Sequence, residues 1–415
     1  MNDTLVTEPA ARTGNSLFRI AASHAGGGLP IAGGDVARWI LGAADRGESD
    51  VKFLDELCWR LVGQGVPLAR ATLHFGTLHP LISGLAVRWS RPRALTEEIH
   101  IAHGADGTDE YLRSPIRSTI ERGEPFRRRL DRDHPEFPLL GEIRAAGGTE
   151  YLAMPLNPFL ERWPVVTWTT DRTGGFTEAH VGALLDVVPA LAAIVDSRAV
   201  RRVSANLLGT YLGPEASRRV LAGQVRRGEG VSLNAVIMAT DLRGFTALSD
   251  RLDASEMIAL LDDYFDAIAS PIHERQGEVL KFIGDGVLAI FPVTGAPAEA
   301  CTAALRAVAA ARAGMAHLDA VRQAQGLPPL PFGAALHLGE MLWGNIGAVD
   351  RLDFTAIGPA VNLVSRLEGL CRPLGRWVLI SGTVAAETTM ALMPLGEHVL
   401  RGIAAPCTVF TLPDA

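Results

Sequence analysis

The sequence predicts an α+β protein of two domains, and three observations lead to that prediction. The chain has 415 residues, more than one domain usually contains. Hydrophobic residues make up 48% of it, which is enough for well-packed cores. Strand-like apolar runs and segments of helical periodicity occur both before and after a polar stretch at 213–230. That stretch is therefore expected to join two separately folded parts.

The first part should follow a disordered tail at 1–16 and extend over residues 17–197. Residues 49–65 have helical periodicity and end in glycine. Short strands should follow, and a long helix should begin at Phe176. This order resembles a GAF-type sensory domain, with a PAS-type domain as the alternative. The resemblance implies regulation by a small molecule or another signal that the sequence does not identify.

The long helix continues toward a helical linker at 198–230. Its apolar residues recur at helical spacing between Val181 and Tyr211, and Pro189 should kink it or begin a new helix. Two interpretations stay open for this helix. It pairs in parallel with a second copy across a dimer, or it packs on its own domain.

The second part, residues 231–415, begins with a strand at 234–242. Asp253 and Glu256 form a capping box before a helix, and Asp285–Gly286 marks a hairpin between two apolar runs. A further helix should precede three short strands at 332–339, 340–347 and 353–358. This order suits a ferredoxin-like βαββαβ sandwich.

Two aspartates stand out because each follows an apolar strand. If the strands that precede Asp241 and Asp285 are neighbours, the two carboxylates meet at one edge of the sheet. Paired carboxylates suit two Mg²⁺ or Mn²⁺ ions that hold a nucleoside triphosphate. Taken alone, Asp241 would more often cap a helix and Asp285 would more often serve a turn.

The segments 234–249, 278–291 and 337–368 resemble, in this order, the catalytic domain of class III adenylate and guanylate cyclases. The resemblance covers residues 231–415. It implies a homodimer that converts ATP or GTP into a 3′,5′-cyclic nucleotide and pyrophosphate, with two metal ions in each shared site. It implies that the metal ions are held by Asp241, Asp285 and the Leu242 carbonyl, and that the phosphates are bound by Gly244, Phe245, Thr246 and Arg401. It also implies that Asn362 orients the ribose and that Arg366 stabilises the transition state. Lys281 and Thr355 would read the base.

Adenine is the expected base. It needs a donor opposite N1 and an acceptor opposite N6, which suits Lys281 and Thr355, whereas the guanylate members carry Glu and Cys there. Lys281 is one of only two lysines in the chain, with Lys52. Pro359, which departs from the family pattern, suits the first turn of a helix. The alternatives are a guanylate cyclase, a silent nucleotide-binding domain, and a sensor or scaffold whose main function lies in the first 200 residues.

The composition argues against several other classes. A net charge of −7 without a basic block disfavours nucleic acid and anionic membranes as partners. The N-terminus lacks a signal-peptide pattern, and the apolar stretch 180–195 is too short to span a bilayer, so a soluble cytoplasmic protein is expected. Four scattered cysteines predict buried thiols, with no disulfide framework or zinc site.

Some isolated patterns have ordinary explanations. Gly-Gly-Asp at 33–35 lacks the following Glu-Phe of diguanylate cyclases, and its Asp35 should cap a helix. Histidines in the first domain could hold haem or a metal, although strand and loop positions make this the less favoured interpretation: His74, His79, His100 and His103.

Overall fold

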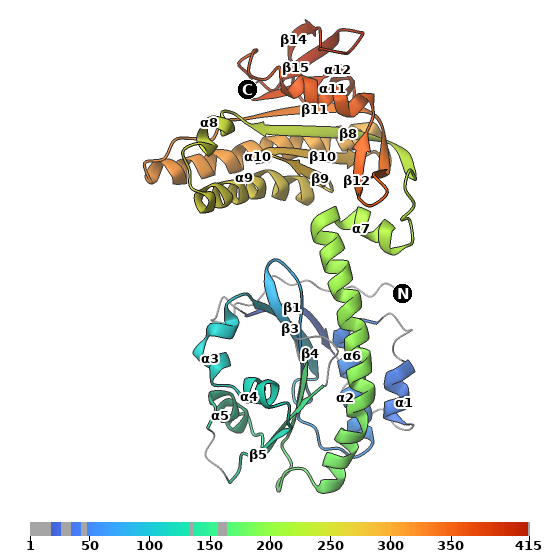
Figure 1. The fold of residues 1–415 in the computed structure, drawn as a ribbon, viewed down its shortest axis with the longest axis vertical. Coiled ribbons are helices and arrows are strands. Elements are labelled where there is room, and N and C mark those ends of the chain that lie inside the picture. The colour runs from blue at the N-terminus through green and yellow to red at the C-terminus, as the bar shows by residue number, and fades with distance from the viewer. Residues whose placement is uncertain (1–17, 26–34, 43–47, 133–135, 157–163, 414–415) are drawn as a thin grey trace. The chain divides into compact units, whose positions relative to one another are not determined.

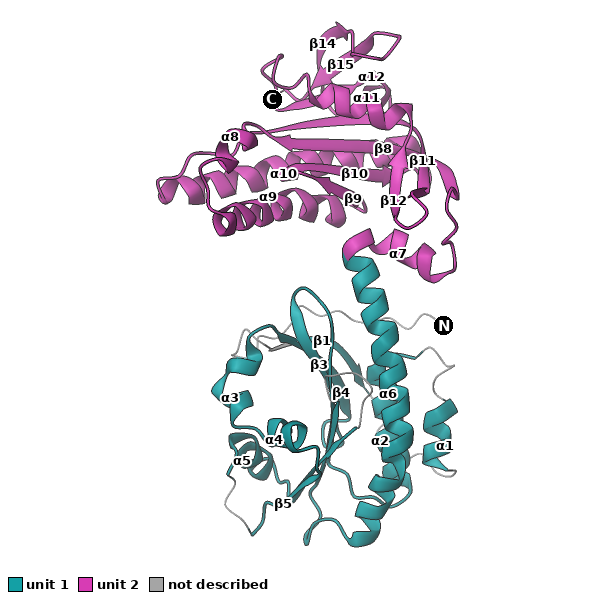
Figure 2. Cartoon of the chain, in the orientation of Figure 1, with its two compact units in different colours: residues 1–210 teal, residues 211–415 magenta. Residues whose placement is uncertain are grey.

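The computed structural model describes residues 18–25, 35–42, 48–132, 136–156 and 164–413. The chain divides into two compact units, Met1–Thr210 and Tyr211–Ala415 (Figure 2). The predicted tail at 1–16 lies outside the described residues. Each unit has its own sheet and its own hydrophobic core.

The first unit is built on a seven-stranded sheet in which all paired strands are antiparallel. Its order is β1-β4-β3-β2-β7-β6-β5. The strands are β1 (Phe18–Ala25), β2 (Arg70–Gly76), β3 (Ile82–Ser90), β4 (Leu95–Ala102), β5 (Phe126–Arg129), β6 (Glu150–Pro155) and β7 (Val165–Thr170).

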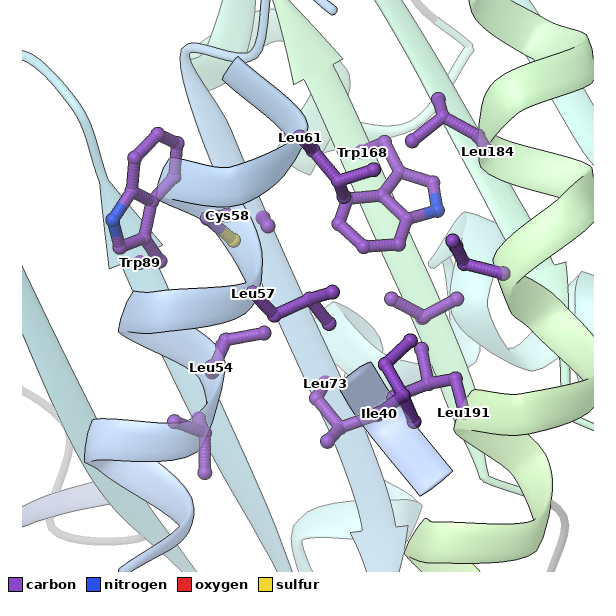
Figure 3. Packing of buried hydrophobic residues seen from close by; sticks show 14 of the residues in the cluster. Ile40, Leu54, Leu57, Cys58, Leu61, Leu73, Trp89, Trp168, Leu184 and Leu191 are labelled. Atoms are coloured by element: carbon purple, nitrogen blue, oxygen red, sulfur yellow. The ribbon is translucent and has the colours of Figure 1, made fainter. Parts of the chain in front are cut away.

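Helices cover both faces of this sheet (Figure 1). On one face lie α1 (Val36–Leu41), α2 (Asp50–Gly63) and α6 (Glu178–Leu212). Figure 3 shows side chains of α2 and α6 packed around Trp168, with Trp89 beside α2. The other face carries a smaller core beneath α4 (Pro115–Arg122) and α5 (Pro138–Ala145). Two short helices, η2 (Ala105–Gly107) and α3 (Asp109–Leu112), come before α4 in the chain.

Helix α6 is continuous over 35 residues, so Pro189 does not begin a new helix. Leu184, Leu191 and Val195 are among its residues buried in the core of the first unit. The interpretation that this helix packs on its own domain is therefore confirmed, and pairing with a second copy stays a prediction. The apolar stretch 180–195 was expected to be too short to span a bilayer. The whole of α6 is nevertheless long and apolar enough to cross a membrane, by length and composition only.

The second unit is built on an eight-stranded sheet of order β14-β15-β13-β11-β8-β10-β9, with β12 paired to β11. The strands are β8 (Gly230–Leu242), β9 (Glu278–Ile283), β10 (Gly286–Pro292), β11 (Phe332–Gly347), β12 (Leu352–Ile357), β13 (Val378–Ser381), β14 (Met393–His398) and β15 (Cys407–Thr411). The separate strands predicted at 332–339 and 340–347 are wrong. They form one strand, which pairs with β8 along nearly its whole length.

Two layers of helices enclose the central strands of this sheet (Figure 1). One layer holds α9 (Ala254–Glu274) and α10 (Pro297–Ala324). The other holds α11 (Pro359–Glu368) and residues of α7 (Pro214–Leu221). The predicted capping box of Asp253 and Glu256 is present at the start of α9. Two short helices, α8 (Phe245–Ser249) and α12 (Gly382–Ala385), follow β8 and β13.

Candidate active site

The structure brings Asp241 and Asp285 together. Asp241 is the penultimate residue of β8, and Asp285 lies in the turn between β9 and β10. Strand β10 pairs with β8 so that Val287 lies opposite Thr240, next to Asp241. Asp285 and Gly286 were expected to form the turn of this hairpin. Because Gly286 pairs with Ile283, the turn instead consists of Gly284 and Asp285. Burial raises the pKa of Asp241 to about 6, and the charge of Asp285 and a hydrogen bond with it act in the same direction.

A third carboxylate, outside the predicted set, approaches this pair from α11. Burial raises the pKa of Glu368 to about 7, Asp241 adds to the shift, and Arg243 opposes it. The carboxylate has room because position 333 is glycine, where a Cβ would collide with Glu368 Oε1. Gly333 lies opposite Asp241 in the register of β11 and β8. The last residue of α11 is thus electrostatically coupled to the aspartate pair.

This arrangement fits divalent cations. The negative charges of Asp241 and Asp285 repel each other. Neither carboxylate forms an ion pair with any described Lys or Arg, so no protein cation offsets this repulsion. The described residues contain no cluster of three or more His, Cys, Asp or Glu side chains suited to hold a metal ion. Two carboxylates and a backbone carbonyl are a partial set of oxygen ligands, which suits a cation such as Mg²⁺ that keeps other positions for water and phosphate.

The loop after Asp241 exposes its backbone. Gly244 caps α8 with φ 76°, a conformation that favours glycine, and a Cβ there would meet nothing within 4 Å. The loop is tied down at Arg243, whose backbone N–H donates to the Pro331 carbonyl at 2.8 Å. Its guanidinium donates to the Arg376 carbonyl. Phe245 and Thr246 then begin α8, so free N–H groups of the helix start lie at the sheet edge that carries Asp241.

Helix α11 carries two of the predicted residues on its outer side. Asn362 and Arg366 are exposed, whereas Ala360 and Val364 are buried against the sheet. Pro359 occupies the first turn of this helix, as expected. Arg401 is exposed in the connection between β14 and β15. No hydrogen bond or ion pair joins these polar residues to the aspartate pair within the described parts of the chain.

Lys281 lies on β9 and makes an ion pair with Asp353 of β12. Thr355, two residues further along β12, is 9% exposed. The structure therefore places β9, which carries Lys281, beside β12, which carries Thr355. Asp353 was not predicted. Its alternation with Thr355 in a strand was a usable signal, because residues i and i+2 share one face.

The structure gives the protein surroundings of the four histidines that were considered as haem or metal ligands. His100 Nε2 lies 3.0 Å from Glu98 Oε1, and His103 Nε2 lies 2.9 Å from the His79 carbonyl. Burial, followed by the charge of Arg70, lowers the pKa of His74 to about 4. Asp35 caps α1, as expected. All four cysteines are free thiols, and three of them are buried.

Comparison with known proteins shows what the second unit is similar to. The family model of the adenylate and guanylate cyclase catalytic domain matches residues 231–410. Over most of its length, the second unit is therefore similar to the catalytic domain of class III nucleotide cyclases. Adenylate cyclase 1 of Rhizobium meliloti is 32% identical over 167 residues, which are 40% of this chain and 25% of that protein. An adenylate cyclase of Anabaena cylindrica is 29% identical over 221 residues, 50% of this chain and 43% of that protein.

The chain therefore spans less than half the length of these two relatives. Among solved structures, the second unit is similar to the adenylyl cyclase CyaB from P. aeruginosa. That chain is 29% identical and has a TM-score of 0.40, and the match covers 45% of this chain and 97% of the other.

Proposed function

We propose that the protein is an adenylate cyclase that converts ATP into 3′,5′-cyclic AMP and pyrophosphate. The observation that carries this proposal is the pair of neighbouring carboxylates, Asp241 and Asp285, inside a region that matches the cyclase family. The names of the two curated relatives support ATP as the substrate. Guanylate cyclase activity is the second candidate, because the Thr355 hydroxyl can both donate and accept hydrogen bonds.

In this reaction the ribose 3′-oxygen forms a bond to the α-phosphorus, and the bond from that phosphorus to the pyrophosphate oxygen breaks. The 3′-hydroxyl gives up its proton to solvent water, and pyrophosphate leaves with the electron pair of the broken bond. Two bound Mg²⁺ or Mn²⁺ ions, held by Asp241, Asp285 and the Leu242 carbonyl, would lower the pKa of that hydroxyl and neutralise the phosphates. Asn362 would orient the ribose, and Arg366 would donate hydrogen bonds to the α-phosphate as its negative charge grows.

The remaining residues bind the two ends of ATP. Exposed N–H groups at Gly244, Phe245 and Thr246 would hold the β- and γ-phosphates, as helix N-termini commonly do. Arg401 would add a cation on the phosphate side. Lys281 would donate to adenine N1, and Thr355 would accept from N6.

The exposed positions of Asn362 and Arg366 support a homodimer whose active sites combine residues of two chains. Apolar residues at the β9–β12 edge also favour a covering partner, since Phe282 is 51% exposed and Ile283 is 61% exposed. The order β11-β8-β10-β9 supports a ferredoxin-like core within residues 231–415. Residues 17–197 would form a GAF-like regulatory domain, and 198–230 would connect it to the cyclase domain in a cytoplasmic protein.

The test is to incubate the purified chain with ATP or GTP, each with Mg²⁺ or Mn²⁺, and to separate the products by chromatography. We expect cyclic AMP and pyrophosphate in equal amounts from ATP, and less product from GTP. A folded, dimeric chain that forms no cyclic nucleotide under any of these conditions would favour the silent nucleotide-binding alternative. Preferential formation of cyclic GMP would favour the guanylate alternative.

A further inference from the structure

Lys281 has a carboxylate partner that the proposed roles do not use. Its ammonium group makes an ion pair with Asp353 across the gap between β9 and β12. The side chain of Lys281 is 27% exposed, and that of Asp353 is 57% exposed. No other hydrogen bond or ion pair is found for the Lys281 ammonium within the described chain.

Fold stability does not explain this pair. Ion pairs as exposed as this one contribute little to the free energy of unfolding. The strand β12 is already held by its ladder with β11, in which Asp353 lies opposite Ile346 and Thr355 lies opposite Gly344. The effect of the pair is therefore on the position of Lys281. It holds the ammonium group of this flexible side chain beside β12.

The position of this ammonium decides which purine it can bind. Lysine carries its charge on four flexible methylene groups and can move between neighbouring acceptors. An ammonium fixed opposite N1 donates to adenine and meets the N1–H donor of guanine. An ammonium free to move by one ring position donates equally well to guanine O6. A lysine reads adenine only where something restrains it.

We propose that Asp353 is a positioning residue that gives the site its preference for ATP by restraining Lys281. This inference rests on the proposed function and adds a determinant of base choice outside the pair Lys281 and Thr355. Thr355 cannot supply the restraint to the same degree, because a hydroxyl is neutral and its hydrogen rotates. A carboxylate only accepts at neutral pH, and its charge holds the ammonium in place.

The test compares Asp353→Asn, Asp353→Glu, Lys281→Ala and the double variant of Lys281→Ala with Asp353→Asn. Asp350→Asn is the matched control, because it removes the same charge from the adjacent turn and Asp350 has no ion pair within the described chain. Calorimetry measures binding of 3′-deoxy-ATP and 3′-deoxy-GTP to each full-length chain. Both ligands lack the attacking hydroxyl, so the readout does not depend on turnover. The ATP and GTP values of kcat/KM are measured in parallel.

We expect Asp353→Asn to lower the ratio of ATP to GTP affinity about tenfold, the scale of one charged hydrogen bond. Asp353→Glu should keep most of the ratio, and Asp350→Asn should keep all of it. The double variant should match Lys281→Ala, since Asp353 acts through Lys281. The unfolding midpoint of each variant should stay at the parent value, because Asp353 is exposed.

Two results would overturn the inference and leave the proposed function intact. One is a ratio of ATP to GTP affinity in Asp353→Asn that equals the parent ratio. This result would count against the inference whatever the effect of Lys281→Ala on the ratio. The other is an equal loss for both nucleotides, which indicates general damage to the site. A parent chain that neither binds 3′-deoxy-ATP nor produces cyclic AMP would instead overturn the proposed function and this inference with it.

Discussion

At the scale of single residues, the aspartate pair is costly to the metal-free protein. The pKa of Asp241 is raised from 3.8 to about 6, first by burial and then by Asp285. Above pH 6 the Asp241 carboxylate is charged, and the folded chain contains its repulsion with Asp285 while the unfolded chain does not. The site therefore destabilises the fold in the absence of a cation and would be stabilised by one.

We therefore predict that Asp241→Asn lowers the catalytic rate without lowering the thermal stability of the metal-free protein. The cyclase rate should fall by at least about 100-fold, the scale of removing one preorganised electrostatic group. At pH 8 without divalent cations, the unfolding midpoint should stay equal or rise, because Asn removes the repulsion. Product formation and thermal unfolding measure the two effects.

Asp262→Asn is the control, since Asp262 is an exposed acid on α9 away from the site. It should change neither readout. Near-parent turnover of Asp241→Asn at saturating Mg²⁺ would contradict the assignment of Asp241 to the metal site.

The sequence located Asp241 and Asp285 because strand ends and hairpins are local patterns. It did not locate Glu368 or Asp353, because their roles arise from contacts between distant segments. Glu368 reaches the aspartates only because Gly333 leaves space on β11. Asp353 meets Lys281 only because the β11–β12 hairpin folds back toward β9. The position of Asp353 two residues before Thr355 places both on one strand face, but it does not reveal the contact with Lys281. No sequence pattern marks the closeness of Glu368 to the aspartates.

His337 gives the second unit another pH-sensitive feature. It is 8% exposed on β11, and its Nδ1 lies 3.0 Å from Ser381 Oγ, with no carboxylate partner in the described chain. Burial lowers its pKa from 6.5 to about 4. The unfolded chain therefore binds more protons between these values, so stability is present above pH 6.5 and is lost as the pH falls toward 4.

We predict that the free energy of unfolding of the second unit falls by up to about 3 kcal/mol across this window because of His337. His337→Gln should remove that part of the pH dependence, as measured by denaturant unfolding from pH 7 to 4. His317→Gln, at an exposed position of α10, is the control and should retain it. An identical slope in His337→Gln and the parent would show that His337 does not titrate on unfolding.

At the scale of elements, α6 is fixed to the first unit by charge as well as by apolar burial. Arg198 donates to Asp50 Oδ1 at 2.9 Å, and Arg202 bonds both Asp50 and Glu98. The Arg198 guanidinium also lies 4.5 Å from the centroid of the Phe53 ring. Asp50 is 8% exposed at the start of α2, so two arginines of α6 meet one buried carboxylate.

Asp50→Asn should weaken this attachment, because it removes a buried charge and leaves Arg198 and Arg202 short of a partner. We predict a loss of about 1.5–3 kcal/mol in the stability of the first unit, the range for hydrogen bonds to charged groups. Amide exchange of residues 198–212 should become faster. Asp186→Asn, on an exposed part of α6, should leave both measurements unchanged. Unaltered exchange in Asp50→Asn would show that the Asp50 carboxylate is not needed to hold the helix.

The elements show which sequence patterns were decisive and which were not. The capping box at Asp253 and Glu256 began α9 as predicted, because its two hydrogen bonds are local. The break predicted between residues 339 and 340 is absent from β11. The long ladder with β8 keeps the strand continuous there. Pro189 likewise lies inside α6, where packing against the core outweighs one lost hydrogen bond.

At the scale of the whole molecule, every proposed catalytic residue lies in the second unit, so removing residues 1–210 should leave the chemistry intact. We predict a changed rate at saturating ATP and an unchanged ratio of ATP to GTP use. The sign of the change depends on a signal that the sequence does not identify. Enzyme kinetics and light scattering on the truncated chain provide the test. A folded, dimeric fragment with parent kinetics would count against a regulatory first unit.

The last prediction concerns assembly. In one chain the aspartate pair lies at the end of β8, while Asn362 and Arg366 project from the exposed side of α11. No described contact joins the two groups, yet the proposed reaction needs both at one α-phosphate. A two-fold symmetric dimer resolves this conflict, because each site would take its aspartates from one chain and its arginine from the other.

Asp285→Ala and Arg366→Ala chains should therefore be nearly inactive alone and recover activity when mixed. In a mixed dimer both defects fall in one site, and the other site is intact. Random exchange makes about half of the dimers mixed, so the rate should approach roughly a quarter of the parent rate. Mass spectrometry confirms the exchange, and mixing each variant with itself is the control. Confirmed exchange without recovery would mean that each chain builds its active site alone, and that Arg366 acts away from the aspartates of the partner subunit.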